Sequence, residues 1–310
     1  MPHPDSTIFL IILMGKDDMA ASVDSRKTYK NIPDEIIQQV ARFPNMPQAG
    51  TKLMSLIQEK DVSAQEIEKI LRHDPGLAAN VLRLANSAYF GIPSKVSNLK
   101  QAIVLLGVKR FAQIAVGACV SQTMGTAVEG YGLSPGQLWL HSIAAATFAE
   151  ALAKNRKLAE AVDFFVPALL HDLGKLVMGE FVKAERRKIK DLVDKGVPFI
   201  IAEKEILGTD HAEIAALILS NWHFPADLID AVRWHHYPEG TNNSNLLPEI
   251  VYLANLLCQF NGGGDSTAGR NSAPFSAVLE RLDIKFEQYK AYGEKARSWM
   301  NKLSDSLTFD

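Results

Sequence analysis

The feature that most constrains the fold is a succession of short amphipathic segments, each preceded by a helix-start signal. Ser63 and Glu66 form a capping box ahead of an apolar stripe, and Asp74 precedes Pro75 as an N-cap precedes a first-turn proline. No run of alternating β-branched residues interrupts these segments, so no sheet is expected. The pattern predicts an all-α protein, a multi-helix bundle in two lobes.

The lobes are expected to meet at GTAVEGYGLSPG, a Gly- and Ser-containing stretch over residues 125–136. NGGGDSTAGRNSAP is a second such stretch and predicts a flexible loop, and the first thirty residues lack periodicity. The expected organisation is a loose tail over 1–31, an N-terminal lobe over 32–124, a C-terminal lobe over 125–260, a flexible loop over 261–274 and a helical extension over 275–310.

Several helix boundaries follow from local signals. The helix after Asp74 should stop near Gly91, and Ser97 could cap the next one. Pro167 should start or kink its helix, and a single helix is expected from Val177 to Val193.

Charge and composition exclude several function classes. With 33 Lys+Arg and 35 Asp+Glu the net charge is −2, which argues against a dedicated nucleic-acid binder. Thr7 to Met14 is apolar but far shorter than the ~20 residues of a spanning helix, and no basic residue precedes it as in a signal peptide. The true start could be Met14 or Met19. No membrane association is expected, and two cysteines in apolar runs indicate reduced thiols in a cytoplasmic protein.

Histidines are the residues that point to chemistry. His171 and Asp172 form the one His-Asp pair that lies in an apolar frame, ALLHDLGKL. A buried carboxylate needs compensation, which a divalent metal could supply. A salt bridge to Lys175 or a helix-terminal cap could also supply it, and the pair alone favours one of these over a metal, because ion pairs also occupy such positions. The remaining candidates in this half of the chain are His141, His211, His235 and His236, whereas His73 and His223 are expected at the surface.

The order of these residues resembles the HD superfamily of metal-dependent phosphohydrolases. In that family a histidine, a His-Asp pair and a later aspartate bind metal inside a helical bundle, and the additional histidines are similar to the HD-GYP branch, which hydrolyses cyclic di-GMP. The resemblance implies one or two divalent ions, iron, manganese or similar, held by ligands that match the family pattern: His141, His171, Asp172, His211, His235, His236 and Asn255. Lys175 matches the lysine that follows the pair.

Two departures from the pattern bear on activity. The closing aspartate is replaced by Asn255 in the frame IVYLANLLC, and an amide ligates without negative charge. The tandem histidines are followed by Tyr237-Pro238 without the glycine-rich loop of the HD-GYP branch, so a cyclic-dinucleotide pocket is not implied.

The N-terminal half resembles the HDOD family, the HD-related output domain of bacterial signalling. The stretches DPGLAANVLRLANSAYFG and LKQAIVLLGVKR carry this resemblance, which covers about residues 33–260, and LLHDLGKLV and YLANLL agree with it. It implies a regulatory output module with an HD-like core in its C-terminal lobe, and HDOD chains commonly carry Asn at the closing position.

Two functions follow as hypotheses. The first is a signal-transduction module that presents a surface to a signalling protein or binds a small nucleotide, with a partly retained metal site. The second is a metal-dependent phosphohydrolase or phosphodiesterase, in which a metal lowers the pKa of a bound water, Lys175 stabilises phosphate oxygens and Asp172 bridges metals or orients the nucleophile. The first is favoured because the closing carboxylate is absent.

Overall fold

The structure, a computed structural model, describes residues 32–59, 62–87, 90, 92, 95–158, 161–241, 246–259 and 273–294. These residues form α-helices joined by turns and short 3₁₀ segments, as the sequence predicts, and within them an isolated bridge between Val128 and Leu133 is the sole β-type pairing. The predicted tail of residues 1–31 and nearly all of the predicted loop of residues 261–274 lie outside the described residues.

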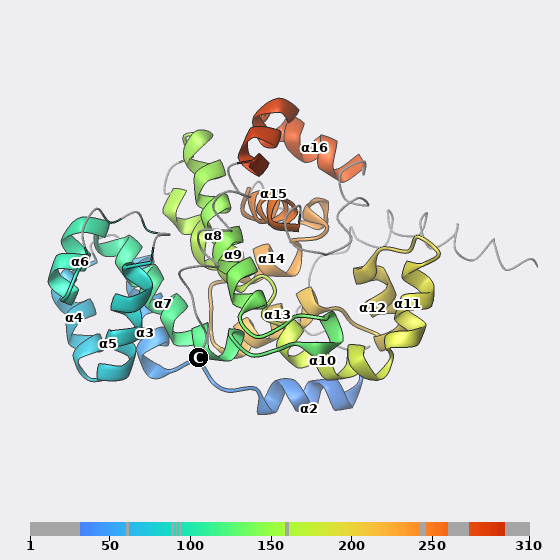
Figure 1. The fold of residues 1–310 in the computed structure, drawn as a ribbon, viewed down its shortest axis with the longest axis horizontal. Helices are drawn as coiled ribbons and strands as arrows, with labels where there is room; N and C mark the ends of the chain where they lie inside the picture. The colour runs from blue at the N-terminus through green and yellow to red at the C-terminus, as the bar shows by residue number, and fades with distance from the viewer. Residues whose placement is uncertain are drawn as a thin grey trace, which may run out of the picture.

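Five helices form a compact group at one end of the molecule, on the left of Figure 1. Long α7 runs along α3, α5 and α6, and it also contacts α8 and α9. Gly117 of α7 admits this contact, because a Cβ there would lie 3.0 Å from Leu169 of α9. The helices of this N-terminal group are α3 (Gln48–Gln58), α4 (Ala64–Arg72), α5 (Pro75–Ala85), α6 (Leu99–Leu106) and α7 (Val108–Met124).

The second group is built around α8 (Gln137–Asn155), which packs along α15 (Leu247–Gln259) and α9 (Phe165–Leu170). Alanines on the buried side of α8 allow these neighbours to approach closely. The remaining helices of this group are α10 (Lys175–Ala184), α11 (Arg186–Val193), α12 (Phe199–Leu207), α13 (His211–Asn221) and α14 (Ala226–Arg233).

The first described helix, α2 (Asp34–Arg42), lies beneath the second group and away from α3–α6 (Figure 1). It packs against α10 and α13 through its buried side chains Ile36 and Val40. The segment after it is also held there, because the indole of Trp222 donates to the carbonyl oxygen of Pro44 over 3.2 Å. The chain therefore crosses the second group before it enters the first.

The predicted N-caps at Ser63 and Asp74 are confirmed, and each accepts a hydrogen bond from a backbone N–H of its helix. The helix after Asp74 is shorter than predicted: α5 ends at Ala85, not near Gly91. The side chain of Asn86 bonds to the backbone of Val96 in both directions, and these bonds turn the chain away from the helix axis. The cap of the next helix is Asn98, which accepts from Gln101, and the prediction of Ser97 is wrong by one residue.

Other boundaries follow local sterics. Pro167 lies in the first turn of α9, where it costs no helix hydrogen bond, as predicted. The single helix expected from Val177 to Val193 is instead two helices, because the chain bends at Glu185 between α10 and α11. The Gly-containing join holds a 3₁₀ turn, η3 (Glu129–Tyr131), that lies directly on α10, where Gly130 meets the backbone of Gly179.

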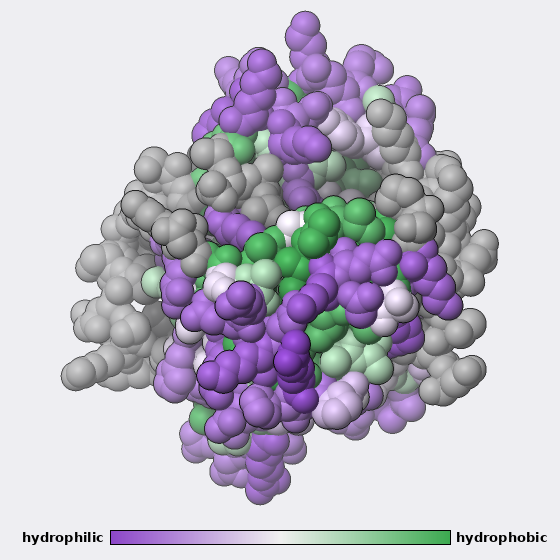
Figure 2. Space-filling view, turned by 90° about the vertical axis from the view of Figure 1, so that its left-hand side faces the viewer, coloured by the Kyte–Doolittle hydropathy of each residue, from purple (hydrophilic) through white to green (hydrophobic). Residues whose placement is uncertain are grey.

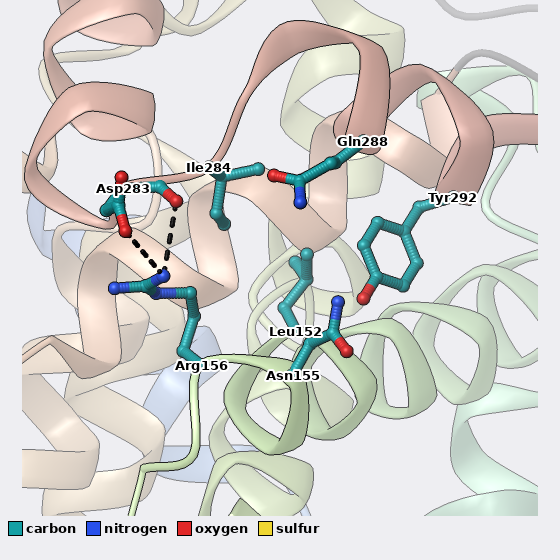
Figure 3. Close-up of a pocket in the computed structure, with 7 residues that line it drawn as sticks. All are labelled: Leu152, Asn155, Arg156, Asp283, Ile284, Gln288 and Tyr292. Carbon is teal, nitrogen blue, oxygen red and sulfur yellow. Dashed lines mark hydrogen bonds and ion pairs between the residues drawn. The ribbon is translucent and has the colours of Figure 1, made fainter.

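The C-terminal helical extension contacts the C-terminal end of α8. Residues 273–281 form α16, and residues 286–294 are again helical. Arg156, at the C-terminus of α8, donates to the carboxylate of Asp283 over 3.1 Å and to its carbonyl oxygen over 3.2 Å (Figure 3). Gln288 and Tyr292 face Asn155 across the small hollow beside this pair (Figure 3).

The exposed face of the N-terminal group carries hydrophobic side chains gathered among polar ones (Figure 2). On α6, Val104 is 82% exposed and Leu105 48% exposed, which is unusual for large hydrophobic residues. No helix within the described residues is long and apolar enough to cross a membrane.

Candidate metal centre

The ends of three helices meet α8 in the middle of the second group. His141 lies one turn into α8, and His171 and Asp172 follow the last residue of α9. His211 is the first residue of α13, and His235 and His236 follow the C-cap of α14. These six side chains, which are far apart in the sequence, form two clusters whose nitrogen and oxygen atoms are near enough to hold metal ions.

Asp172 lies between the two clusters. Its Oδ2 atom is 3.2 Å from Nε2 of His141 and 3.3 Å from Nε2 of His171, and these two nitrogens are themselves 3.2 Å apart. Three potential ligand atoms therefore surround one position, which we call the first position.

The other carboxylate oxygen, Oδ1, faces the second cluster. It lies 3.4 Å from Nε2 of His211 and 3.9 Å from Nε2 of His235. Nε2 of His236 is 3.0 Å from that of His211. We call the space among His211, His235 and His236 the second position, so Asp172 offers one oxygen to each position.

In two of the rings, the nitrogen opposite the metal position is held by a hydrogen bond to a backbone carbonyl group. Nδ1 of His171 lies 2.7 Å from the carbonyl oxygen of Ala168, and Nδ1 of His235 lies 2.6 Å from that of Val232. Both carbonyls are free to accept because they belong to the last turn of a helix. A carbonyl can only accept, so each Nδ1 carries the proton and each Nε2 presents a lone pair to the site.

Burial and neighbouring charges together set the pKa of each of these groups. Burial lowers the pKa of His235 and of His236 well below the usual histidine value, and neighbouring histidines lower both further. Burial also lowers the pKa of His141, with Asp172 opposing it. At Asp172 burial would raise the pKa, but His171 and Lys175 outweigh it and hold the pKa well below the usual range. Neutral imidazoles around an ionised carboxylate are the protonation states that metal binding requires.

The chemistry of the donor set fits a divalent cation. Nε2 of His235 and Oδ1 of Asp172 are buried and make no hydrogen bond with the described residues. Such atoms are costly in a protein interior unless a partner satisfies them. Imidazole nitrogen and carboxylate oxygen suit iron, manganese and zinc, and His141, His171 and Asp172 would hold one ion and His211, His235 and His236 another.

Lys175 lies at the edge of the cluster. Its ammonium group donates to Oδ2 of Asp172 over 2.7 Å, so the salt bridge expected as an alternative to metal is present. The side chains of Lys175 and His141 are 18% and 20% exposed, whereas those of His171 and Asp172 are buried. The first position therefore faces solvent past Lys175 and His141.

Three further residues were singled out in the sequence, one as a candidate ligand and two as surface histidines. Asn255 is buried on α15, which packs against α8, α9 and α14, and its role as a ligand stays a prediction. His73 and His223 are exposed, as expected, and His223 adopts a positive φ of 59° in the turn before α14.

Two residues of the site were missed in the sequence. Glu203 of α12 is fully buried, and its Oε2 atom lies 2.6 Å from Nδ1 of His211. Burial would lower the pKa of His211, but Glu203 outweighs burial and the pKa is raised. Spacing could have revealed it, since Phe199, Glu203 and Leu207 recur every fourth residue on one face of the helix.

Tyr131 of η3 donates its hydroxyl proton to Oε1 of Glu203. Burial, together with Glu203, raises the pKa of this phenol well above its usual value, so it stays protonated and remains a donor. Its ring lies over the ammonium group of Lys175, 5.5 Å from centroid to nitrogen. No local signal marked Tyr131, because it lies in a segment that reads only as a join.

Comparisons with known proteins identify similar chains and folds. A protein of Treponema pallidum (strain Nichols) with the description "uncharacterized protein" is 26% identical over 230 residues, which are 72% of this chain but only 44% of that protein. This chain thus spans less than half the length of that relative.

Solved structures share the fold at low identity. An HDOD domain protein from Geobacter sulfurreducens has a TM-score of 0.69 at 21% identity, over 88% of this chain and 97% of its own. A protein from Shewanella amazonensis SB2B named "putative phosphohydrolase" has a TM-score of 0.69 at 23% identity, over 88% and 98%. The family model of the HDOD domain matches residues 43–238, more than half of the chain, and the chain therefore belongs to the HDOD family.

Proposed function

We propose that this chain is a regulatory output module of signal transduction whose C-terminal lobe binds a pair of divalent metal ions. The observation that carries the proposal is the position of Asp172, with one carboxylate oxygen facing each histidine cluster. A carboxylate shared in this way brings negative charge to two cations at once. Five histidines complete the two positions.

Binding rather than efficient hydrolysis is the proposed role. The resemblance to HD enzymes places a closing aspartate where this chain has Asn255. Without that carboxylate the charge of two divalent ions is less completely offset, and ligand charge strongly affects metal affinity. The exposed Val104 and Leu105 on α6 support a role that includes contact with a signalling protein.

A second function has its own supporting observation. Lys175 is partly exposed beside the first position, and its ammonium group could pair with a phosphate oxygen that approaches from solvent. Bound metal would supply Lewis acidity, Lys175 would stabilise the phosphate oxygens, and Asp172 would hold the metals or orient the nucleophile. This alternative is hydrolysis of a phosphodiester such as a nucleotide or cyclic dinucleotide.

The test is metal analysis of protein purified without a nickel column. We expect wild-type protein to retain iron, manganese or a similar ion, and Asp172→Ala and His171→Ala to lose it, because each removes a central ligand. Occupancy should also fall as the pH drops below ~6.5, where free imidazole takes up protons.

The matched control is Asp163→Ala, which removes an aspartate paired with Lys109 on the surface, away from the histidine clusters. This variant should keep its metal. Stoichiometric metal that persists in both Asp172→Ala and His171→Ala would place the metal site elsewhere and refute the proposal. Hydrolysis of a cyclic dinucleotide that wild type performs and Asp172→Ala does not would favour the second function.

A further inference from the structure

The two metal positions differ in the negative charge available to them. At the first position, Oδ2 of Asp172 lies 3.2–3.3 Å from both histidine nitrogens. At the second position the three ligands of the cluster are imidazoles, and Oδ1 of Asp172 lies farther off, at 3.4 Å from His211 and 3.9 Å from His235. Three neutral ligands offset a divalent cation poorly, so the second position needs charge from another source.

The carboxylate of Glu203 supplies this negative charge indirectly, through its contact with the ring of His211. Its Oε2 atom lies 2.6 Å from Nδ1 of His211, on the opposite side of the ring from the metal position. A carboxylate in this relation fixes the ring orientation, holds the proton on Nδ1 and raises the basicity of Nε2. The corresponding nitrogens of His171 and His235 lie against neutral carbonyl groups, so His211 has a carboxylate where these two rings do not.

The same carboxylate is shared with Tyr131. The phenol donates to Oε1, while the imidazole of His211 donates to Oε2 and its backbone N–H reaches the same oxygen over 3.5 Å. The phenol and the imidazole are therefore the two side chains that share this negative charge. Tyr131 is held in place, because its ring contacts Phe199 at 5.6 Å and His211 at 6.0 Å between centroids. Withdrawing a hydrogen bond from one oxygen of a carboxylate strengthens the bond made by the other.

We propose that Glu203 is a positioning residue that enables the three-histidine position to hold a divalent cation, and that Tyr131 limits how strongly Glu203 does so. This inference rests on the proposed metal-binding function and assigns roles to two residues that are not themselves ligands. It predicts opposite effects for two neighbouring substitutions, whereas a merely structural role would make both harmful.

The test is a titration of the metal-free full-length chain with Co²⁺ at pH 8.5, where free imidazole is neutral. Calorimetry gives the affinities and the visible absorption of Co²⁺ reports the ligand geometry at each step. His141→Ala and His236→Ala, which each remove a partly exposed ligand from one position, assign the two binding steps.

We expect Glu203→Gln to weaken the step assigned to the second position by ~10–100-fold, because the amide keeps the shape but not the charge. The Co²⁺ affinity and the visible absorption of the step assigned to the first position should change little. An unchanged first position also shows that the variant is folded. Tyr131→Phe should raise the Co²⁺ affinity of the second position by about two- to tenfold, which corresponds to the free energy of one hydrogen bond.

Two controls separate these effects from general perturbation. Glu205→Gln removes an exposed carboxylate from the same helix, and Tyr289→Phe removes a buried phenol that bonds to the carbonyl oxygen of Leu253. Neither should alter either step.

Three results would overturn the inference: an unchanged second step in Glu203→Gln, an equal loss at both steps, or a weaker second step in Tyr131→Phe. In each case two-step binding by wild type would leave the proposed function standing. Wild-type protein that takes up no Co²⁺ would contradict the proposed function and the inference together.

Discussion

At the scale of single residues, the candidate metal centre depends on how hydrogen bonds fix the orientation of its buried histidine rings. His171 and His235 use the same local device, an Nδ1 bond to the carbonyl oxygen three residues earlier. This device needs only a histidine just beyond a helix end, where carbonyl groups lack partners. The two Nε2 atoms are thereby directed at Asp172 before any ligand binds.

Asn255→Asp tests whether position 255 belongs to the metal centre. If it closes the site, the new carboxylate should tighten metal binding, and added Mn²⁺ should raise the thermal midpoint of the variant more than that of wild type. Phosphodiesterase activity should then rise above the wild-type background. If no metal is near, an unpaired buried carboxylate should destabilise the fold by a few kcal/mol.

The control is Asn80→Asp on α5, where the amide donates to Ala118 and Ser121, far along the chain from the histidines. Its thermal midpoint should fall regardless of Mn²⁺. A loss of stability in Asn255→Asp that Mn²⁺ does not restore would mean that Asn255 is structural.

At the scale of elements, one turn sets the distance between the two clusters. Gly174 lies between α9 and α10, directly against the first turn of α13. A Cβ at this position would meet the carbonyl oxygen of His211 and lie 2.6 Å from the backbone nitrogen of Ala215. Because these are backbone atoms of α13, a Cβ at position 174 fits only if the whole helix α13 moves away.

Gly174→Ala should therefore displace His211 from Asp172 and weaken metal binding. Overpacking of this kind costs about 1–3 kcal/mol of unfolding free energy. Gly76→Ala on α5 is the control, since its Cβ would find the nearest atom at 3.5 Å. Calorimetric unfolding and metal content measure both effects, and a Gly174→Ala protein as stable and metal-loaded as Gly76→Ala would disprove the argument.

At the scale of the whole molecule, two ion pairs join the helix groups. Arg110 of α7 pairs with Glu150 of α8, and its guanidinium lies over the rings of Phe90 and Phe165. Lys109 pairs with Asp163 nearby, but more of that pair is exposed. The half-buried Arg110 pair should contribute most of the polar stabilisation between the groups.

Arg110→Met should cost about 1–3 kcal/mol of unfolding free energy near pH 7, because it leaves the carboxylate of Glu150 without its partner. Burial already raises the pKa of Glu150, and Arg110 opposes that shift, so the substitution raises the pKa further. A carboxyl group whose pKa is higher in the folded state loses stability as pH rises past its unfolded value. The deficit relative to wild type should therefore grow from pH 4.5 to pH 7.

Urea unfolding across this pH range measures the effect. Adding Glu150→Gln to Arg110→Met should recover much of the loss at pH 7, and Lys109→Met should cost less than 1 kcal/mol. A deficit that is independent of pH would show that lost packing of the arginine, rather than the ion pair, explains the result.

The sequence alone determined the helical class and most helix starts, and it singled out the histidines and the aspartate whose side chains could ligate a metal. These properties are local: a capping side chain such as Ser63 or Asp74 acts within three residues of itself, and amphipathic periodicity is visible in a short window. The HDOD family was likewise evident from contiguous motifs, because stretches such as LLHDLGKLV keep their order in the chain.

The tertiary structure alone decided which side chains meet. It placed α2 under the second group, divided the candidate ligands into two clusters about Asp172 and brought Tyr131 and Glu203 together beside His211. Contacts of this kind depend on how helices cross, which is set by packing over the whole bundle rather than by neighbours in the chain. A buried glutamate among apolar residues signals that a partner exists, but only the fold identifies the partner.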